Sequence, residues 1–170
     1  MTSPDPRWQT DCRHFEGERP CVHRRECEGC DLYAPQGTRI LLLKIGALGD
    51  VLRTTPLLPA LVAGPGPVHV TWVVGERARP LLAGHPRIDR LLTPGYETSE
   101  RLGGEHFAQV LSLDKDPYST SLATRVVADE RRGFGRDRRG ALVPLHPDAQ
   151  FAYDLGLSDH LKFEVNRRTY

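Results

Sequence analysis

Apolar residues along the chain gather into short runs that alternate with amphipathic segments. Residues 39–45 are almost wholly apolar and end at a glycine, which is typical of a strand buried on both faces of a parallel sheet. Further strands or extended segments are predicted at 68–74, 88–92, 109–113, 132–136 and 141–145. Helices are predicted between them, at 51–63, 76–83, 97–105 and 119–128. This alternation predicts an α/β fold with a Rossmann-like, doubly wound parallel sheet.

The first 37 residues differ in character from the rest of the chain. They are polar, and they contain all four cysteines, which are Cys12, Cys21, Cys27 and Cys30. Such a segment has too little apolar surface to fold by burial alone, and thiols in a reducing compartment do not form disulfides. We therefore predict a cysteine-rich, metal-binding leader at residues 1–37 and a Rossmann-like domain at 38–170.

The four thiols predict a structural zinc site. Zinc takes four tetrahedral nitrogen or sulfur ligands and supplies folding energy to small polar segments. The spacing contains a single Cys-x2-Cys pair, Cys27 and Cys30, with His14 and His23 as substitute ligands. An iron–sulfur cluster uses the same four thiolates, so spacing leaves it open. Four unrelated free thiols are the alternative interpretation.

Composition narrows the function classes. The chain has 39% apolar and 26% charged residues, with 23 Lys and Arg against 22 Asp and Glu. This balance is globular, and a net charge of +1 removes the electrostatic case for nucleic-acid binding. No run approaches the roughly 18 apolar residues of a membrane-spanning helix, so a cytoplasmic location is expected. Five arginines between Arg131 and Arg139 are interleaved with acidic residues and predict a solvated face; the alternative is contact with anionic lipopolysaccharide or the inner membrane surface.

The strongest local motif is the turn Lys44-Ile-Gly-Ala-Leu-Gly-Asp50, which follows the first predicted strand. Gly46 and Gly49 permit a tight turn and close backbone approach by a ligand, at the strand end where open α/β sheets bind ligands. The motif lacks the third glycine of a dinucleotide fingerprint and the Gly-Lys-Ser/Thr ending of a P-loop. On the residues alone, a plain turn in which Asp50 caps the next helix is the alternative interpretation.

The run RILLLKIGALGDVLRTTPLLPAL at residues 39–61 resembles the amino-terminal signature of glycosyltransferase family 9, the heptosyltransferases and their relatives. VTWVVGERARPLL, IDRLL and RRGFG extend the likeness. The resemblance implies the amino-terminal, acceptor-side half of a GT-B fold. It also implies inverting transfer of a sugar from a nucleotide diphosphate donor to a lipopolysaccharide-type or other saccharide acceptor. By the same resemblance, Asp50 is the catalytic base. A similar cysteine-rich leader precedes some members.

The chain also departs from the family pattern. The carboxyl-terminal domain that binds the nucleotide-sugar in relatives is absent from these 170 residues, so we expect this chain alone to be inactive. Where relatives often have Asp-Leu-Gln-Gly, residues 112–116 are Ser-Leu-Asp-Lys-Asp. Asp114 and Asp116 are predicted to bind sugar hydroxyls, with helix capping before Pro117 as the alternative. Lys44 is predicted to neutralise charge at the site, with a snorkelling surface lysine as the alternative.

These residues fit the chemistry of an inverting transfer. A single displacement at the anomeric carbon requires a carboxylate beside the acceptor hydroxyl, on the face opposite the leaving diphosphate. Asp50 is predicted to serve as this base, with Lys44, Gly46 and Gly49 binding substrate around it. The rival hypothesis is a non-catalytic saccharide- or protein-binding module with a structural zinc knuckle.

Overall fold

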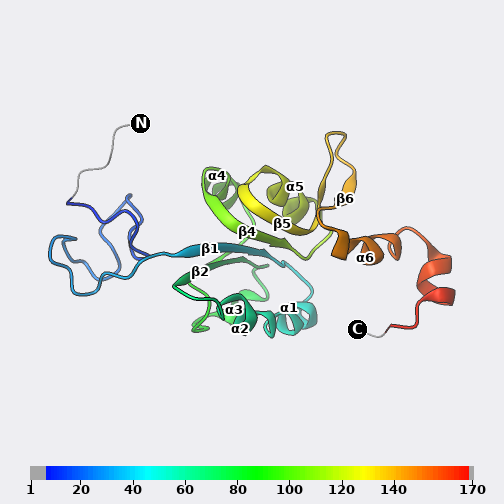
Figure 1. The fold of residues 1–170 in the computed structure, drawn as a ribbon, viewed down its shortest axis with the longest axis horizontal. Helices are drawn as coiled ribbons and strands as arrows, with labels where there is room; N and C mark the ends of the chain where they lie inside the picture. The colour runs from blue at the N-terminus through cyan, green and yellow to red at the C-terminus, as the bar shows by residue number, and fades with distance from the viewer. Residues whose placement is uncertain (1–6, 169–170) are drawn as a thin grey trace.

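The computed structural model describes residues 7–168 and contains one six-stranded sheet (Figure 1). The strands are β1 (Thr38–Leu43), β2 (Val68–Val73), β3 (Arg90–Leu92), β4 (His106–Ser112), β5 (Val127–Arg136) and β6 (Leu142–Pro144). Their order across the sheet is β3-β2-β1-β4-β5-β6, with β1 to β5 parallel and β6 antiparallel to β5. This arrangement confirms the predicted Rossmann-like α/β fold.

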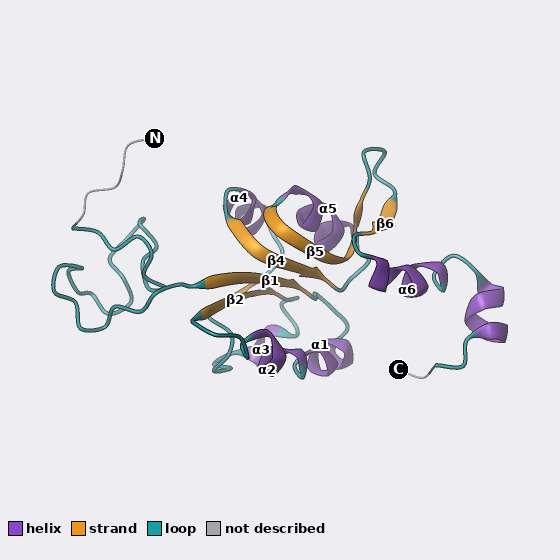
Figure 2. Ribbon diagram, in the orientation of Figure 1, coloured by secondary structure: helices purple, strands orange, loops and turns teal. Residues whose placement is uncertain are grey.

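Short helices cover both faces of the sheet. They are α1 (Leu48–Thr54), α2 (Leu57–Leu61), α3 (Arg79–Leu82), α4 (Tyr96–Gly103), α5 (Pro117–Arg125) and α6 (Gln150–Asp154). A 3-10 turn at Pro147–Ala149 precedes α6, and a π-helical turn lies at Leu161–Val165. Figures 1 and 2 show α1, α2 and α3 on one face and α4 and α5 on the other. Within residues 7–168, no helix has both the length and the apolar character needed to cross a bilayer.

The apolar run in β1 supplies both halves of the core. Leu41 and Leu43 pack with Phe107 and Leu122 beneath α4 and α5, whereas Leu42 packs into the cluster beneath α1 to α3. Successive side chains of a strand point to opposite faces, so a strand covered on both sides must be apolar at every position. This requirement explains why β1 shows no alternation with polar residues.

The predicted helix at 51–63 is two helices. Helix α1 ends at Thr54, and α2 begins at Leu57. Pro56 lies between them and has no backbone N–H to donate to a preceding carbonyl, so an uninterrupted helix would lose a hydrogen bond there. The prediction of one continuous helix was therefore wrong.

Arg131, Arg132 and Arg136 of the arginine-rich run lie in β5, whereas Arg138 and Arg139 follow the strand and are exposed, so two predictions are corrected in part. The helix expected to reach residue 128 ends at Arg125, and Val127 begins β5. Arg131 donates hydrogen bonds to the carbonyl oxygens of Ala123, Val126 and Ala128, at 3.1, 2.5 and 3.2 Å. Its guanidinium thus satisfies backbone acceptors where α5 ends. The run is not simply a solvated face, and Arg131 is not available to an anionic surface.

The segment before β1 contacts the sheet through Arg13. Its guanidinium forms an ion pair with Asp89 at 2.9 Å and donates to the carbonyl oxygen of Val68 at 2.8 Å. Within residues 7–37, Cys12 and Pro35 form one isolated, antiparallel β-bridge. The first strand starts at Thr38. The leader boundary at residue 37 itself stays a prediction.

An ion cluster lies at the amino-terminal ends of the strands. Glu105 precedes β4, pairs with Arg39 of β1, and accepts two hydrogen bonds from Arg90 of β3, at 2.9 and 2.5 Å. Arg39 also lies over the ring of Phe107, 4.8 Å from its centroid. Burial raises the pKa of the Glu105 carboxyl, but Arg90 and Arg39 outweigh it and hold the pKa below its ordinary value. Glu105 is therefore a partly buried anion that joins three strands.

The burial of His69 predicts how the free energy of unfolding depends on pH. Its side chain is 4% exposed in β2, and burial lowers its pKa from 6.5 to about 4, although Asp89 opposes the shift. The folded chain keeps His69 neutral while the unfolded chain takes up a proton below about pH 6.5, so folding is weakened as the pH falls. We expect this residue to remove about 3 kcal/mol of unfolding free energy between pH 6.5 and 4.

Urea unfolding of the wild type and His69→Gln at pH 7, 5.5 and 4 measures this effect. The wild type should lose more stability than the variant over this range. Equal pH dependence in the two proteins would show that His69 is not the group responsible.

Candidate functional site

The candidate site lies where the sheet changes direction of winding. Strand β1 connects through α1 and α2 to β2 on one side, and β4 connects through α5 to β5 on the other. The carboxyl ends of β1 and β4 therefore border the crevice in which open α/β sheets bind ligands. Two segments meet there: the turn at 44–50 after β1, and residues 113–116 after β4.

Hydrogen bonds hold the turn after β1 against β2 and the loop that follows it. The indole of Trp72 donates to the carbonyl oxygen of Lys44 at 3.1 Å, and the N–H of Gly75 donates to that of Ile45 at 2.9 Å. A Cβ at Gly75 would lie 2.7 Å from the Ile45 oxygen, so this position requires glycine. A Cβ at Gly46 or Gly49 would meet nothing within 4 Å. These two glycines border open space, and their contact with substrate stays a prediction.

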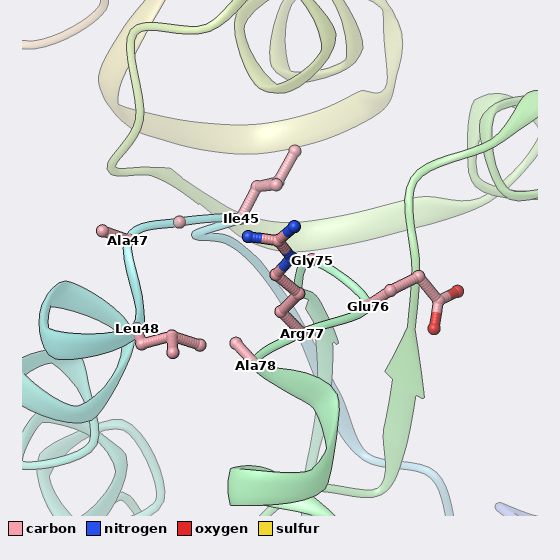
Figure 3. A pocket seen from close by; sticks show the side chains of 8 residues that line it. Ile45, Ala47, Leu48, Gly75, Glu76, Arg77 and Ala78 are labelled. Atoms are coloured by element: carbon pink, nitrogen blue, oxygen red, sulfur yellow. The ribbon is translucent and has the colours of Figure 1, made fainter.

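A pocket of about 350 Å³ opens between these two loops (Figure 3). It is lined by residues 45–48 and 75–78. Figure 3 shows Leu48 and Ala78 pointing toward one another, Arg77 extending toward Ile45, and Glu76 pointing away. Among the residues that the structure describes, Arg77 has no ion-pair partner. The pocket has the size of a small-molecule site and offers an apolar wall beside one cation.

Asp50 lies on α1, two residues after Leu48, which lines this pocket; Asp50 itself is not a lining residue. Its side chain is 41% exposed, accepts a hydrogen bond from Arg53 one turn further on, and has Oδ2 3.8 Å from the Lys44 ammonium. The hydrogen bond from Arg53, and then the charge of Lys44, hold the pKa of the Asp50 carboxyl below its ordinary value. Ala47 is the N-cap residue of α1, and the Asp50 carboxylate also hydrogen-bonds to the Ala47 backbone, so the interpretation of Asp50 as a residue that caps the helix start holds in part. Asp50 is an exposed, ionised carboxylate that can receive a proton.

Lys44 and Asp114 form a buried pair across the two strands. Lys44 is 9% exposed, and its ammonium pairs with one oxygen of Asp114. The other oxygen of Asp114 accepts the backbone N–H groups of Ile45 and Gly46, at 2.5 and 3.2 Å. The alternative of a snorkelling surface lysine is therefore wrong, and Lys44 neutralises protein carboxylates. Direct contact of Lys44 or Asp114 with a substrate stays a prediction.

Asp116 has a different role in the structure. Its Oδ1 accepts the backbone N–H groups of Tyr118 and Ser119, at 2.9 and 3.0 Å, at the start of α5. This is N-capping, with Pro117 at the first helical position. The capping interpretation is confirmed, and contact of Asp116 with a sugar hydroxyl stays a prediction.

The structure does not support the metal site. Cys12 is buried, and Cys21, Cys27 and Cys30 are half-buried; all four are free thiols. The carbonyl oxygens of Cys12, Cys21 and Cys27 each accept an N–H three residues on, so each opens a turn. Within residues 7–168, no three or more His, Cys, Asp or Glu side chains are placed to hold one ion. Zinc and an iron–sulfur cluster would both need these thiols together, so the cofactor stays a prediction that the geometry does not favour.

Gly75 and Arg77 are site residues that the sequence analysis did not identify as such. Both follow β2 in the segment Val-Val-Gly-Glu-Arg. In both cases a glycine directly follows a buried apolar run: Gly46 follows residues 39–45, and Gly75 follows residues 68–74. This repeated pattern at two neighbouring strands was the signal available in the sequence. Nothing local in the sequence indicates that the two loops touch.

No family model and no curated protein matches the sequence. Solved structures do match in fold. The glycosyl transferase family 9 from Veillonella parvula DSM 2008 aligns with a TM-score of 0.52 and 24% identity, over 58% of this chain and 32% of that chain. E. coli heptosyltransferase WaaC aligns in its complex with ADP (TM-score 0.47, 27% identity, 61% and 36% of the two chains). It also aligns in its complex with ADP-2-deoxy-2-fluoro heptose (TM-score 0.46, 24% identity, 59% and 36%).

The chain spans about one third of the length of the solved structures it matches. The resemblance to family 9 that the sequence indicated is confirmed at the level of fold by the Veillonella structure. The sheet and its flanking helices thus have the fold of part of a family 9 glycosyltransferase.

Proposed function

We propose that this chain is the acceptor-binding part of an inverting, heptosyltransferase-like glycosyltransferase. The observation that carries the proposal is an exposed, ionised carboxylate, Asp50, on the helix whose first residue, Leu48, lines the pocket at the switch point of the sheet. In the reaction, Asp50 takes the proton of an acceptor hydroxyl as its oxygen bonds to the anomeric carbon of the donor sugar. The bond from that carbon to the diphosphate breaks on the opposite face.

The neighbouring residues have supporting roles in this proposal. Arg53, and then Lys44, favour the ionised form of Asp50, and Gly46 and Gly49 leave room for the sugar ring. Arg77 binds an anionic group of the acceptor, because its guanidinium is the cation that lines the pocket. The donor of WaaC in the matched structure is an ADP-heptose analogue, and a donor of that class fits the proposal. In this proposal the donor binds to a separate domain, as the resemblance to family 9 implies.

The second candidate is a non-catalytic saccharide-binding module. It is supported by the lining of the pocket, residues 45–48 and 75–78, which does not include Asp50. A module would bind a saccharide in the same pocket without transferring a sugar. The two candidates therefore share the binding site and differ in the role of Asp50.

Binding by the 170-residue chain tests the site that both candidates need. Amide NMR spectra are recorded with a deacylated, phosphorylated inner-core oligosaccharide of lipopolysaccharide, and separately with ADP-heptose. We expect the oligosaccharide to shift the amide signals of Gly46, Gly49, Gly75 and Arg77. We expect ADP-heptose to show no saturable binding at millimolar concentration. Loss of the Arg77 charge in Arg77→Gln should weaken oligosaccharide binding by about tenfold.

Arg79→Gln is the matched control. Arg79 is also exposed and lies two residues further along, but it does not line the pocket. Its affinity should equal that of the wild type. Oligosaccharide shifts confined to the leader or to the amino-terminal ends of the strands would contradict the proposed site.

A further inference from the structure

Asp114 joins the end of β4 to the turn after β1. One of its oxygens pairs with the Lys44 ammonium, and the other accepts the backbone N–H groups of Ile45 and Gly46. Its side chain is 14% exposed. A single carboxylate therefore satisfies three donors of one turn, at a depth where unpaired polar groups are costly.

Lys44 is shared between two carboxylates. Besides its pair with Asp114, its ammonium lies 3.8 Å from Oδ2 of Asp50. We propose that Asp114 is a positioning residue, which fixes the turn before Asp50 and holds Lys44 so that its charge is divided between Asp114 and Asp50. The meaning of this role for catalysis rests on the proposed function of Asp50 as a base, whereas the contacts themselves do not.

The charges around Asp50 give the proposal a directional consequence. Asp50 is close to two cations, Lys44, which follows β1, and Arg53, which is on the same helix as Asp50. Lys44 also pairs with a second carboxylate, that of Asp114. Without the Asp114 charge, Lys44 has Asp50 as its remaining carboxylate, so the ionised form of Asp50 is favoured further. Without the Lys44 charge, Asp50 loses a cation and lies near an unneutralised Asp114, so ionisation becomes harder.

The experiment follows the titration of the Asp50 carboxyl carbon by NMR in the 170-residue chain. The proteins are the wild type, Asp114→Asn and Lys44→Met, and amide hydrogen exchange is measured in each. We expect the Asp50 titration to move to lower pH in Asp114→Asn and to higher pH in Lys44→Met. In Asp114→Asn, exchange at Ile45 and Gly46 should accelerate by about tenfold or more, because the bracing charge is gone.

Asp116→Asn is the matched control, because it removes a carboxylate two residues away that caps α5 instead of the turn. It should change neither the Asp50 titration nor exchange at Ile45 and Gly46. If Asp114→Asn unfolds, the upward shift in Lys44→Met still tests the shared cation. An unmoved Asp50 titration in Lys44→Met, or unchanged turn exchange in a folded Asp114→Asn, would overturn the proposal.

These readouts need no catalysis. Opposite shifts in the two variants together with no sugar transfer by the complete gene product would leave the positioning role intact and remove the proposed function. Where transfer is measured, Asp114→Asn should lower kcat with little change in KM for the acceptor, since Asp114 faces the protein rather than the pocket.

Discussion

Replacing Glu105 by leucine should lower the free energy of unfolding by about 3–5 kcal/mol. Glu105 is 18% exposed and pairs with Arg39 and Arg90, whose side chains are nearly as buried. Without the carboxylate, both guanidinium groups would remain near the core with no anion to compensate them. The loss therefore comes mainly from the two unpaired cations rather than from the absent hydrogen bonds.

Urea unfolding at pH 7 measures this loss. Asp129→Asn is the control, because it removes a hydrogen bond with His106 in which both side chains are more than half exposed. Exposed pairs of this kind contribute about 0–1 kcal/mol. A Glu105→Leu effect as small as that of Asp129→Asn would show that the cluster is not a buried charge network. Because Glu105 lies at the opposite ends of the strands from Asp50, the variant should keep its binding site when folded.

The fold was largely predictable because its core strands are covered on both sides. The run at 39–45 and the run at 68–74 are apolar at successive positions, and both are central strands. Burial on both faces leaves this mark in the sequence directly. The glycine that ends the first run also located the turn at the switch point correctly.

The sequence predicted 132–136 as extended, but the first half of β5 was harder to predict because its partners are distant residues. Its sequence is rich in charges, which favour a solvated segment when taken alone. In the structure, Arg131 is used by backbone carbonyls of the preceding helix, and Glu130 accepts a hydrogen bond from Gln109 of β4 at 2.6 Å. Tertiary contacts of this kind leave no periodic signal in the sequence.

The site shows the same division between local and distant information. The turn that carries Asp50 could be located from local features, glycine spacing and strand position, but the role of Asp50 as a base came from the resemblance to family 9. Lys44 and Asp114 were both singled out, but their pairing could not be predicted, since the two residues are 70 positions apart and meet only when β4 pairs with β1. Clustering of cysteines was also a local signal, but the folded leader does not bring the four thiols into one site.

Asp50→Asn should reduce the rate of sugar transfer by about 10²–10⁴-fold in the complete gene product. Asparagine keeps the size of the side chain but cannot accept the proton of the acceptor hydroxyl. Asp50 is exposed and its pair with Arg53 is on the surface, so the variant should fold with a stability close to that of the wild type. Glu76→Gln is the matched control, because Glu76 borders the same pocket but points away from it (Figure 3).

The most direct test of Asp50 as the base is the initial rate of transfer from ADP-heptose to the oligosaccharide acceptor, with both at saturating concentration. The wild type and Glu76→Gln should transfer sugar at similar rates, and Asp50→Asn should be at least about 100-fold slower. Equal rates for Asp50→Asn and the wild type would contradict a catalytic role for this carboxylate.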